Sequence, residues 1–496
     1  MGIWSRKTVE MCTEEAFSSK GPQLRRSLGV VGLTAFGVGC TIGAGIFSLT
    51  GAVAAHQAGP AVSLSFVLAS VACFFAGLCY AEFAAMVPVS GSAYTYAYVT
   101  LGELVAWLIG WNLVLEWLFS ASVVAVSWSG YTTAALRELG IVLPGVLTSS
   151  PLKVDDAGHL VASGAYFNVP AVLVVAVCTL LLLVGTRASS LVNTVMVLAK
   201  IVALVLLVAV GARYVRAENW HPFVPANTGQ FGHFGWSGVA RGAGTLLFAY
   251  LGFDGVSTLA AEARDPQRAV PWSLFASLLV CTLLYTSVSI VVTGIANYRF
   301  LDVPDPLYYA LSAYRASIAP IRYLVSIVAV VGLVSVVLTC ILGQARIFYA
   351  MARDGLLPPA LERVTRVTGV PSAATILTGA VAGVVAGLVP LDILGELVSI
   401  GTLMAFAAVC AGIPILRRIA PDAHRPFRAP WVPVIPALGV LSCTALMFSL
   451  PPSTWVRLIL WIAAGLLIYA AYGRHHSRLR ARSLALTGGR VTGPVA

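Results

Sequence analysis

The sequence predicts an all-α integral membrane protein with twelve transmembrane helices. Of its 496 residues, 58% are hydrophobic and only 10% are charged, and the mean hydropathy is +0.89. A soluble globule of this length carries more polar residues than that on its surface. In addition, apolar stretches of about 20 residues, the length that crosses a bilayer, recur from end to end. These observations exclude a soluble fold.

The predicted helices can be placed from the apolar stretches and tested with the charged loops. Their starts lie near Leu28, Pro60, Tyr94, Val169, Leu191, Trp236, Val270, Ile321, Pro371, Asp392, Val432 and Thr454. With the amino terminus inside, most of the 31 lysines and arginines fall on the inner side, as the positive-inside rule requires. We therefore expect a multi-pass protein of the cell membrane with both termini in the cytoplasm. Because the basic residues are scattered, the net charge of +11 does not indicate a nucleic-acid partner.

Two of the hydrophobic stretches are interrupted by glycine-rich runs, Gly39–Gly45 and Phe248–Gly255. Irregular backbone at membrane depth is tolerated only where it lines a cavity, and matching breaks in two halves of a chain indicate a transport site between inverted repeats. We expect a five-plus-five inverted repeat with broken helices 1 and 6, plus two trailing helices. The predicted parts are a cytoplasmic tail (1–27), the first repeat (28–215), the second repeat (216–418), helices 11 and 12 (419–473) and a basic cytoplasmic tail (474–496).

The two breaks offer complementary backbone groups. Gly43, Ala44 and Gly45 would place free N–H groups at the start of a half-helix, where the helix dipole also favours a carboxylate. The alternative is close helix packing through small residues. A half-helix ending at Phe248–Leu251 would leave carbonyl oxygens for an ammonium group. Together these groups predict a site for an α-amino acid.

Lys200 is the charged residue that most needs an explanation. It lies in the middle of a predicted helix, where a charge costs roughly 2.5–3.5 kcal/mol on insertion scales and cannot easily reach the interface. A desolvated lysine can carry a proton, and a fixed ammonium can take the place of a sodium ion. The alternative is a static tether that bonds carbonyl groups of helix 1.

Other polar side chains are predicted within the membrane. Glu116 and Asp254 could each meet a cationic substrate side chain, although Asp254 could equally cap the half-helix that follows Gly252. Glu82 and Glu396 are nearer to helix ends, which favours gating or structural pairing. Tyr285 is predicted to be an ordinary packing residue, although its hydroxyl needs a hydrogen-bond partner there.

We expect no metal and no cofactor. The cysteines lie mostly within apolar segments, the histidines lie in loops or at segment edges, and neither forms a cluster with metal-ligand spacing. The helices also contain no Ser/His constellation. A membrane enzyme is therefore disfavoured.

Several motifs, in the same order along the chain, resemble the amino acid, polyamine and organocation superfamily. Within it, the chain is similar to the cationic amino acid transporter family, in its twelve-helix bacterial type. The resemblance is carried by Thr41–Phe47, Ser90–Tyr96, Gly110–Glu116, Phe248–Asp254, Glu262–Pro271, Arg346–Leu357 and Gly395–Thr402.

The resemblance implies the inverted repeat and secondary active uptake of L-amino acids. It also implies roles for individual residues. The substrate carboxylate would bind Gly43, Ala44 and Gly45; its amine would bind the backbone at Thr41, Ile42, Phe248, Ala249 and Leu251; Glu116, Asp254 and Leu333 would form or adjoin the side-chain pocket; and Lys200 and Tyr285 would couple a proton.

The predicted function is a permease that takes up L-amino acids by alternating access with proton coupling. An exchanger of one amino acid for another is the alternative, and a sensor that binds without transport is a further one. The substrate stays open: Glu116 and Asp254 favour a cationic side chain, whereas Leu333 and Lys200 favour a small neutral one. The expected partners are the amino acid, protons and the bilayer, with a small membrane subunit or a second copy of the chain left open.

Overall fold

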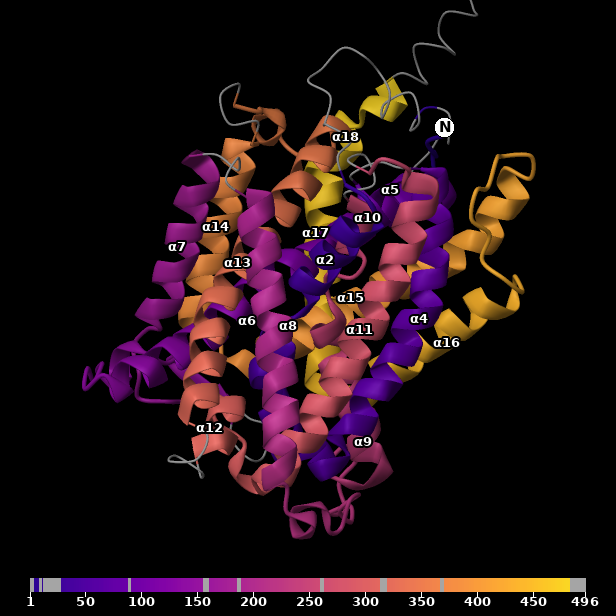
Figure 1. The fold of residues 1–496 in the computed structure, drawn as a ribbon. Coiled ribbons are helices and arrows are strands. Elements are labelled where there is room, and N and C mark those ends of the chain that lie inside the picture. Colours follow the sequence, from indigo (N-terminus) through magenta and orange to yellow (C-terminus); the bar gives the residue numbers. More distant parts are fainter. Residues whose placement is uncertain are drawn as a thin grey trace, which may run out of the picture.

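The computed structural model describes residues 4–8, 11, 28–87, 91–154, 160–184, 189–258, 263–312, 319–365 and 370–481. Within these ranges the chain is a bundle of α-helices (Figure 1), so the predicted all-helical class is confirmed. Most of the predicted amino-terminal tail, the end of the basic tail, Ser90 and Glu262 lie outside the described residues. The helices are α2 (Val30–Thr41), α3 (Thr50–Val53), α4 (Val62–Met86), α5 (Ser92–Thr100), α6 (Glu103–Glu138), α7 (Val169–Val184), α8 (Ser189–Gly211), α9 (Gly235–Leu246), α10 (Gly255–Thr258), α11 (Pro266–Ile295), α12 (Pro306–Ser312), α13 (Ala319–Arg353), α14 (Ser372–Leu388), α15 (Leu391–Ile419), α16 (Val434–Ser449), α17 (Pro452–Ile468) and α18 (Arg474–His476).

Many of these helices are built for a membrane. Among the described residues, seven helical segments are long and apolar enough to cross a bilayer, and α2, α7, α14 and α16 are shorter apolar helices. Large apolar side chains also point outward, such as Leu180 at 62%, Leu283 at 61% and Ile459 at 61% exposure. Apolar surface of this kind is stable in lipid and unstable in water. The chain is a multi-pass membrane protein.

The start of the third predicted segment, near Tyr94, is wrong. The structure has a separate helix, α5, followed by α6 from Glu103. Gly102 between them has a φ of +95°, which L side chains rarely adopt, and a Cβ there would lie 2.9 Å from the Trp4 carbonyl oxygen. The residues on both sides are apolar enough to be taken for one helix, so hydropathy alone does not reveal this turn. Other starts agree with the prediction, including α7 at Val169.

Both predicted helix breaks are present. Helix α2 ends at Thr41, and helical structure resumes with a π-helical turn at Gly45–Leu49 before α3. Helix α9 passes into a 3-10 turn at Leu247–Tyr250, after which the chain is irregular until α10. The breaks touch each other: Gly252 has a φ of +103°, and a Cβ there would lie 2.7 Å from Cβ of Cys40. Figure 1 shows α2 and α10 together in the middle of the bundle.

Long helices surround the breaks. Helix α6 packs against α13 and α15, α11 packs against α4 and α2, and α8 packs against α13 and α2. The core between them holds buried aromatic side chains, including Tyr80, Trp107 and Tyr250. The connection between α6 and α7 carries a short antiparallel hairpin that was not predicted, with β1 (Leu152–Val154) paired to β2 (Leu160–Ala162).

The two acids predicted to lie near helix ends have structural partners. The buried Glu82 carboxylate accepts hydrogen bonds from Nε and Nη2 of Arg417, at 3.1 and 2.8 Å, and from the Ala429 N–H at 2.7 Å. Glu396 accepts from the Thr454 hydroxyl at 2.6 Å and from Arg457 at 3.3 Å. These pairs join α4 to α15 and to the segment that follows it, and α15 to α17, which confirms structural pairing for both acids.

Candidate functional site

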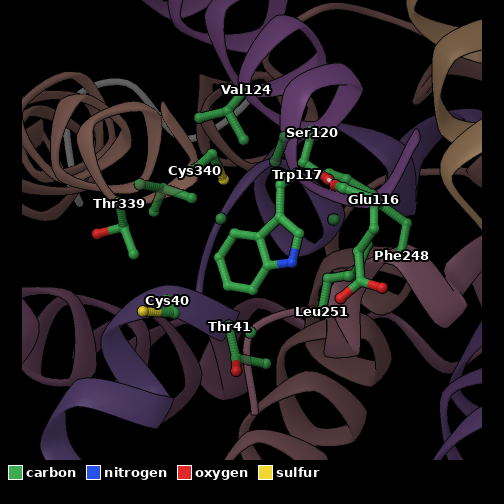
Figure 2. Close-up of a pocket in the computed structure, with 15 residues that line it drawn as sticks. Cys40, Thr41, Glu116, Trp117, Ser120, Val124, Phe248, Leu251, Thr339 and Cys340 are labelled. Atoms are coloured by element: carbon green, nitrogen blue, oxygen red, sulfur yellow. Dashed lines mark hydrogen bonds between the residues drawn. The ribbon is translucent and has the colours of Figure 1, made fainter. Parts of the chain in front are cut away.

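A pocket lies between the two helix breaks. It is formed by the break after α2, one face of α6, the break after α9 and one face of α13 (Figure 2). These four segments are far apart in the sequence, so only the folded chain brings their side chains together. The lining residues are Cys40, Thr41, Gly43, Ala44, Gly45, Glu116, Trp117, Ser120, Val124, Phe248, Leu251, Gly252, Val336, Thr339 and Cys340.

The first break presents backbone N–H groups to the pocket. Gly43, Ala44 and Gly45 all line it, and no other described residue accepts a hydrogen bond from their N–H groups. They stand directly before the helical turn of Gly45–Leu49, where the helix dipole is positive. This is an arrangement that binds an anion such as a carboxylate. Gly45 also allows a close approach of the two breaks, because a Cβ there would lie 2.4 Å from Cα of Ala249.

The second break presents carbonyl groups. Phe248 and Leu251 line the pocket, and within the described ranges no residue donates to the carbonyl oxygens of Ala249 or Leu251. The Phe248 carbonyl already accepts from the Leu251 N–H at 3.1 Å, which leaves it one further lone pair. The oxygens of Phe248 and Leu251 can accept from an ammonium group in the pocket, whereas Ala249, also predicted to bind the amine, lies outside the lining.

Lys200 joins three parts of the fold. Its side chain is completely buried, and Nζ donates to the carbonyl oxygens of Gly39 and Ile42 and to the Ser335 hydroxyl, each at 3.1 Å. The lysine therefore bonds the carboxyl end of α2 to α8 and α13. A Cβ at Gly332 would lie 2.6 Å from Cε of Lys200. The close packing of α13 against the lysine therefore requires glycine at position 332. An ammonium group has three donors, and all three are used.

Tyr285 of α11 donates its hydroxyl to the Thr41 carbonyl oxygen at 2.7 Å, and the ring is fully buried. The carbonyl groups of Thr41 and Ile42, both predicted to meet the substrate amine, are thus already bonded by Tyr285 and Lys200. Each carbonyl keeps a second lone pair. The Tyr285 hydroxyl, which the sequence analysis expected to need a partner, is therefore bonded to the end of the first half-helix.

The two buried acids lie close together. Glu116 lines the pocket, and Asp254, in the second break, is fully buried and does not belong to the lining. Their carboxyl groups are near enough to interact electrostatically, but among the described residues neither carboxyl group has a hydrogen-bond partner. Two buried carboxyl groups without a hydrogen-bond partner can bind a donor.

The remaining predicted residue, Leu333, is fully buried and lies outside the pocket lining. It stands one helical turn before Val336, which does line the pocket together with Thr339 and Cys340. The sequence reading also missed Trp117, next to Glu116. Helical spacing gives a signal for some missed residues, since Ser120 and Val124 follow Glu116 at intervals of four (Figure 2); Cys40 and Thr339 had no such signal.

A multi-pass helical protein in which two broken helices present opposite backbone groups to one central pocket has the architecture of a membrane transporter. The comparisons with known proteins agree. A family model described as "Amino acid permease" matches residues 28–470. This chain belongs to the amino acid permease family and is a transporter, not an enzyme.

Several named relatives match most of this chain. The "Branched-chain amino acid permease BcaP" of Bacillus subtilis (strain 168) is 44% identical over 94% of this chain and 96% of its own length. The "Methylthioribose transporter" of the same organism is 42% identical over 96% of this chain and 99% of its own length. The "Cationic amino acid transporter 4, vacuolar" of Arabidopsis thaliana is 36% identical over 84% of this chain and 67% of its own length.

Proposed function

We propose that this chain is a proton-coupled symporter that takes up a neutral L-amino acid. The observation that carries the proposal is the pairing of free N–H groups at Gly43–Gly45 with carbonyl groups at Phe248 and Leu251 around one pocket. The N–H groups bind the substrate carboxylate and the carbonyl groups bind its ammonium. The site therefore binds the α-carboxylate and α-ammonium groups, which all α-amino acids share.

Lys200 is the proposed coupling group. All three N–H donors of its ammonium group form hydrogen bonds, two with the end of α2 and one with α13. A neutral amine has only two N–H donors, and its lone pair repels a carbonyl oxygen. Loss of the proton therefore weakens the link between α8 and the first break. Because the same break binds the substrate carboxylate, protonation and substrate binding act on one element.

The proposed architecture has twelve membrane crossings, with helices 1–5 repeated upside down as helices 6–10. The described amino-terminal residues lie at the same end of the bundle as α18 (Figure 1), as an even number of crossings requires. The distribution of lysine and arginine in the loops favours the cytoplasm for that end. The bacterial relatives favour the cell membrane as its location.

A neutral side chain is favoured over a cationic one for two reasons. Apolar side chains of Val124, Leu251 and Val336 line the pocket, and two of the relatives that span almost the whole chain carry names with uncharged substrates, branched-chain amino acids and methylthioribose. A cationic amino acid is the second candidate, because Glu116 lines the pocket and its carboxyl oxygens have no hydrogen-bond partner among the described residues.

The test is uptake into proteoliposomes that contain the purified protein, with an outside pH one unit below the inside pH. The radiolabelled panel is alanine, valine, leucine, isoleucine, lysine, arginine and methylthioribose. Accumulation of a neutral amino acid that a protonophore abolishes is the expected result.

Other outcomes overturn parts of the proposal. Absence of uptake of every amino acid rejects the permease, and accumulation of arginine or lysine in preference to leucine rejects the neutral substrate. Uptake that requires an amino acid inside the vesicle, without proton movement, identifies an exchanger instead.

A further inference from the structure

The side chain of Trp117 occupies an unusual place in the pocket. Figure 2 shows its indole ring lying across the cavity among the other lining residues, with the nitrogen on the side of Glu116 and Phe248. The residue is 5% exposed, and within the described part of the chain Nε1 has no hydrogen-bond partner. The ring is therefore held in position by packing and not by a polar contact.

Two glycines provide that packing. A Cβ at Gly343 of α13 would lie 2.4 Å from Cε3 and 2.7 Å from Cζ3 of the indole. A Cβ at Gly255, the first residue of α10, would lie 3.1 Å from Cη2. The ring thus rests against bare backbone on two sides. A side chain added at Gly343 would lie too close to the ring for both to keep their places, so the ring or α13 must shift.

The walls beside the ring suit an uncharged side chain. Val124 of α6 and Val336 of α13 line the pocket. A Cβ at Gly43 would lie 3.9 Å from the Val124 side chain and 3.4 Å from the Val336 side chain. They therefore stand next to the proposed carboxylate site. A substrate bound there would have its side chain near these apolar groups and the indole.

We propose that Trp117 is the specificity-determining residue of the pocket, its indole ring forming the wall that limits the substrate to short aliphatic side chains. This inference rests on the proposed function and adds the substrate's size class to it. The backbone breaks bind the amino acid head group, and Trp117, positioned by Gly255 and Gly343, selects the side chain.

Two substitutions move the wall in opposite directions. Trp117→Leu removes most of the ring and enlarges the pocket, so phenylalanine and methionine should gain about 10-fold or more in apparent affinity relative to alanine, since one methylene in an apolar pocket is worth roughly 10-fold or more in discrimination. Gly343→Ala pushes the ring inward, so leucine and isoleucine should lose about 10-fold or more relative to glycine and alanine.

The measurement is competition by unlabelled glycine, alanine, valine, leucine, isoleucine, methionine and phenylalanine against binding of radiolabelled alanine to purified protein. Gly383→Ala in α14 is the matched control, because its Cβ would meet Val172 and Val175 at an ordinary 3.8 Å. The control should keep the wild-type order of affinities.

The outcomes separate the two proposals. Binding of no amino acid by the wild-type protein overturns the proposed function itself. Wild-type binding with unchanged ratios among the competitors in both Trp117→Leu and Gly343→Ala, or an equal loss of all competitors, overturns the role of Trp117. If Trp117→Leu does not fold, the ratios in Gly343→Ala decide alone.

Discussion

Replacement of Lys200 by methionine tests the proposed coupling most directly. Methionine keeps much of the buried aliphatic stem and removes the ammonium group, which donates three hydrogen bonds of 3.1 Å. Ser335 keeps a bond to the Gly332 carbonyl oxygen at 2.7 Å, so the loss falls mainly on the carbonyl groups of Gly39 and Ile42. Hydrogen bonds from a charged donor are worth about 1.5–3 kcal/mol each, so the link between α8 and the first break loses about 3–6 kcal/mol.

The consequence for transport can be expressed as an accumulation ratio. A difference of one pH unit supplies about 1.4 kcal/mol per proton, which supports roughly 10-fold accumulation for one proton per substrate. The wild-type protein should approach this ratio in proteoliposomes. Lys200→Met should reach a ratio of about 1, because it has no proton to exchange at this position, while counterflow driven by internal substrate continues.

The assay compares uptake at equal and unequal pH, with and without internal substrate. Lys153→Met, in the exposed strand β1, is the matched control and should accumulate as the wild-type protein does. Accumulation of about 10-fold by Lys200→Met would refute the coupling role. Loss of counterflow together with accumulation in a folded variant would identify Lys200 as a static tether.

Three further substitutions test the fold and the site. Gly45→Ala places a Cβ 2.4 Å from Cα of Ala249, about 1 Å inside normal contact, and should lower apparent substrate affinity about 10-fold or more in a binding assay. Glu82→Gln removes the charge that Arg417 bonds twice and should lower the free energy of unfolding by about 2–3 kcal/mol, measured by thermal unfolding in detergent, with KM unchanged. Burial raises the pKa of Asp305 from 3.8 to about 7, so the folded state holds this proton more tightly than the unfolded chain. Its stabilising effect is complete below pH 4 and is lost as the pH rises to 7, and Asp305→Asn should flatten that part of the stability profile.

Each of these predictions has an outcome that contradicts it. Wild-type affinity in Gly45→Ala would mean that the two breaks can separate without cost, and Gly383→Ala is again the control for an added methyl group. An unchanged melting temperature in Glu82→Gln would show that the arginine contacts are exchanged for water. An unchanged slope between pH 4 and 7 in Asp305→Asn would show that another group titrates there.

Much of the fold follows from the sequence because the membrane simplifies the problem. Each crossing must satisfy its own backbone hydrogen bonds, so continuous apolar runs become helices, and starts such as Val169 for α7 can be placed to the residue. The glycine runs predict the breaks for the same reason. The boundary at Gly102 could not be predicted, because a turn within apolar sequence depends on the close approach of Trp4, a distant residue.

The sequence by itself determined the class of the protein, the position of both breaks and the backbone groups that they expose at Gly43–Gly45 and Phe248–Leu251. These are local properties of glycine and of helix ends. Only the tertiary structure decided that Lys200 bonds the end of α2, that Glu116 lines the pocket, and that Trp117 lies across the pocket against Gly343. Each of these facts is a contact between helices distant in the chain, and hydropathy, which measures one segment at a time, contains no information about which faces meet.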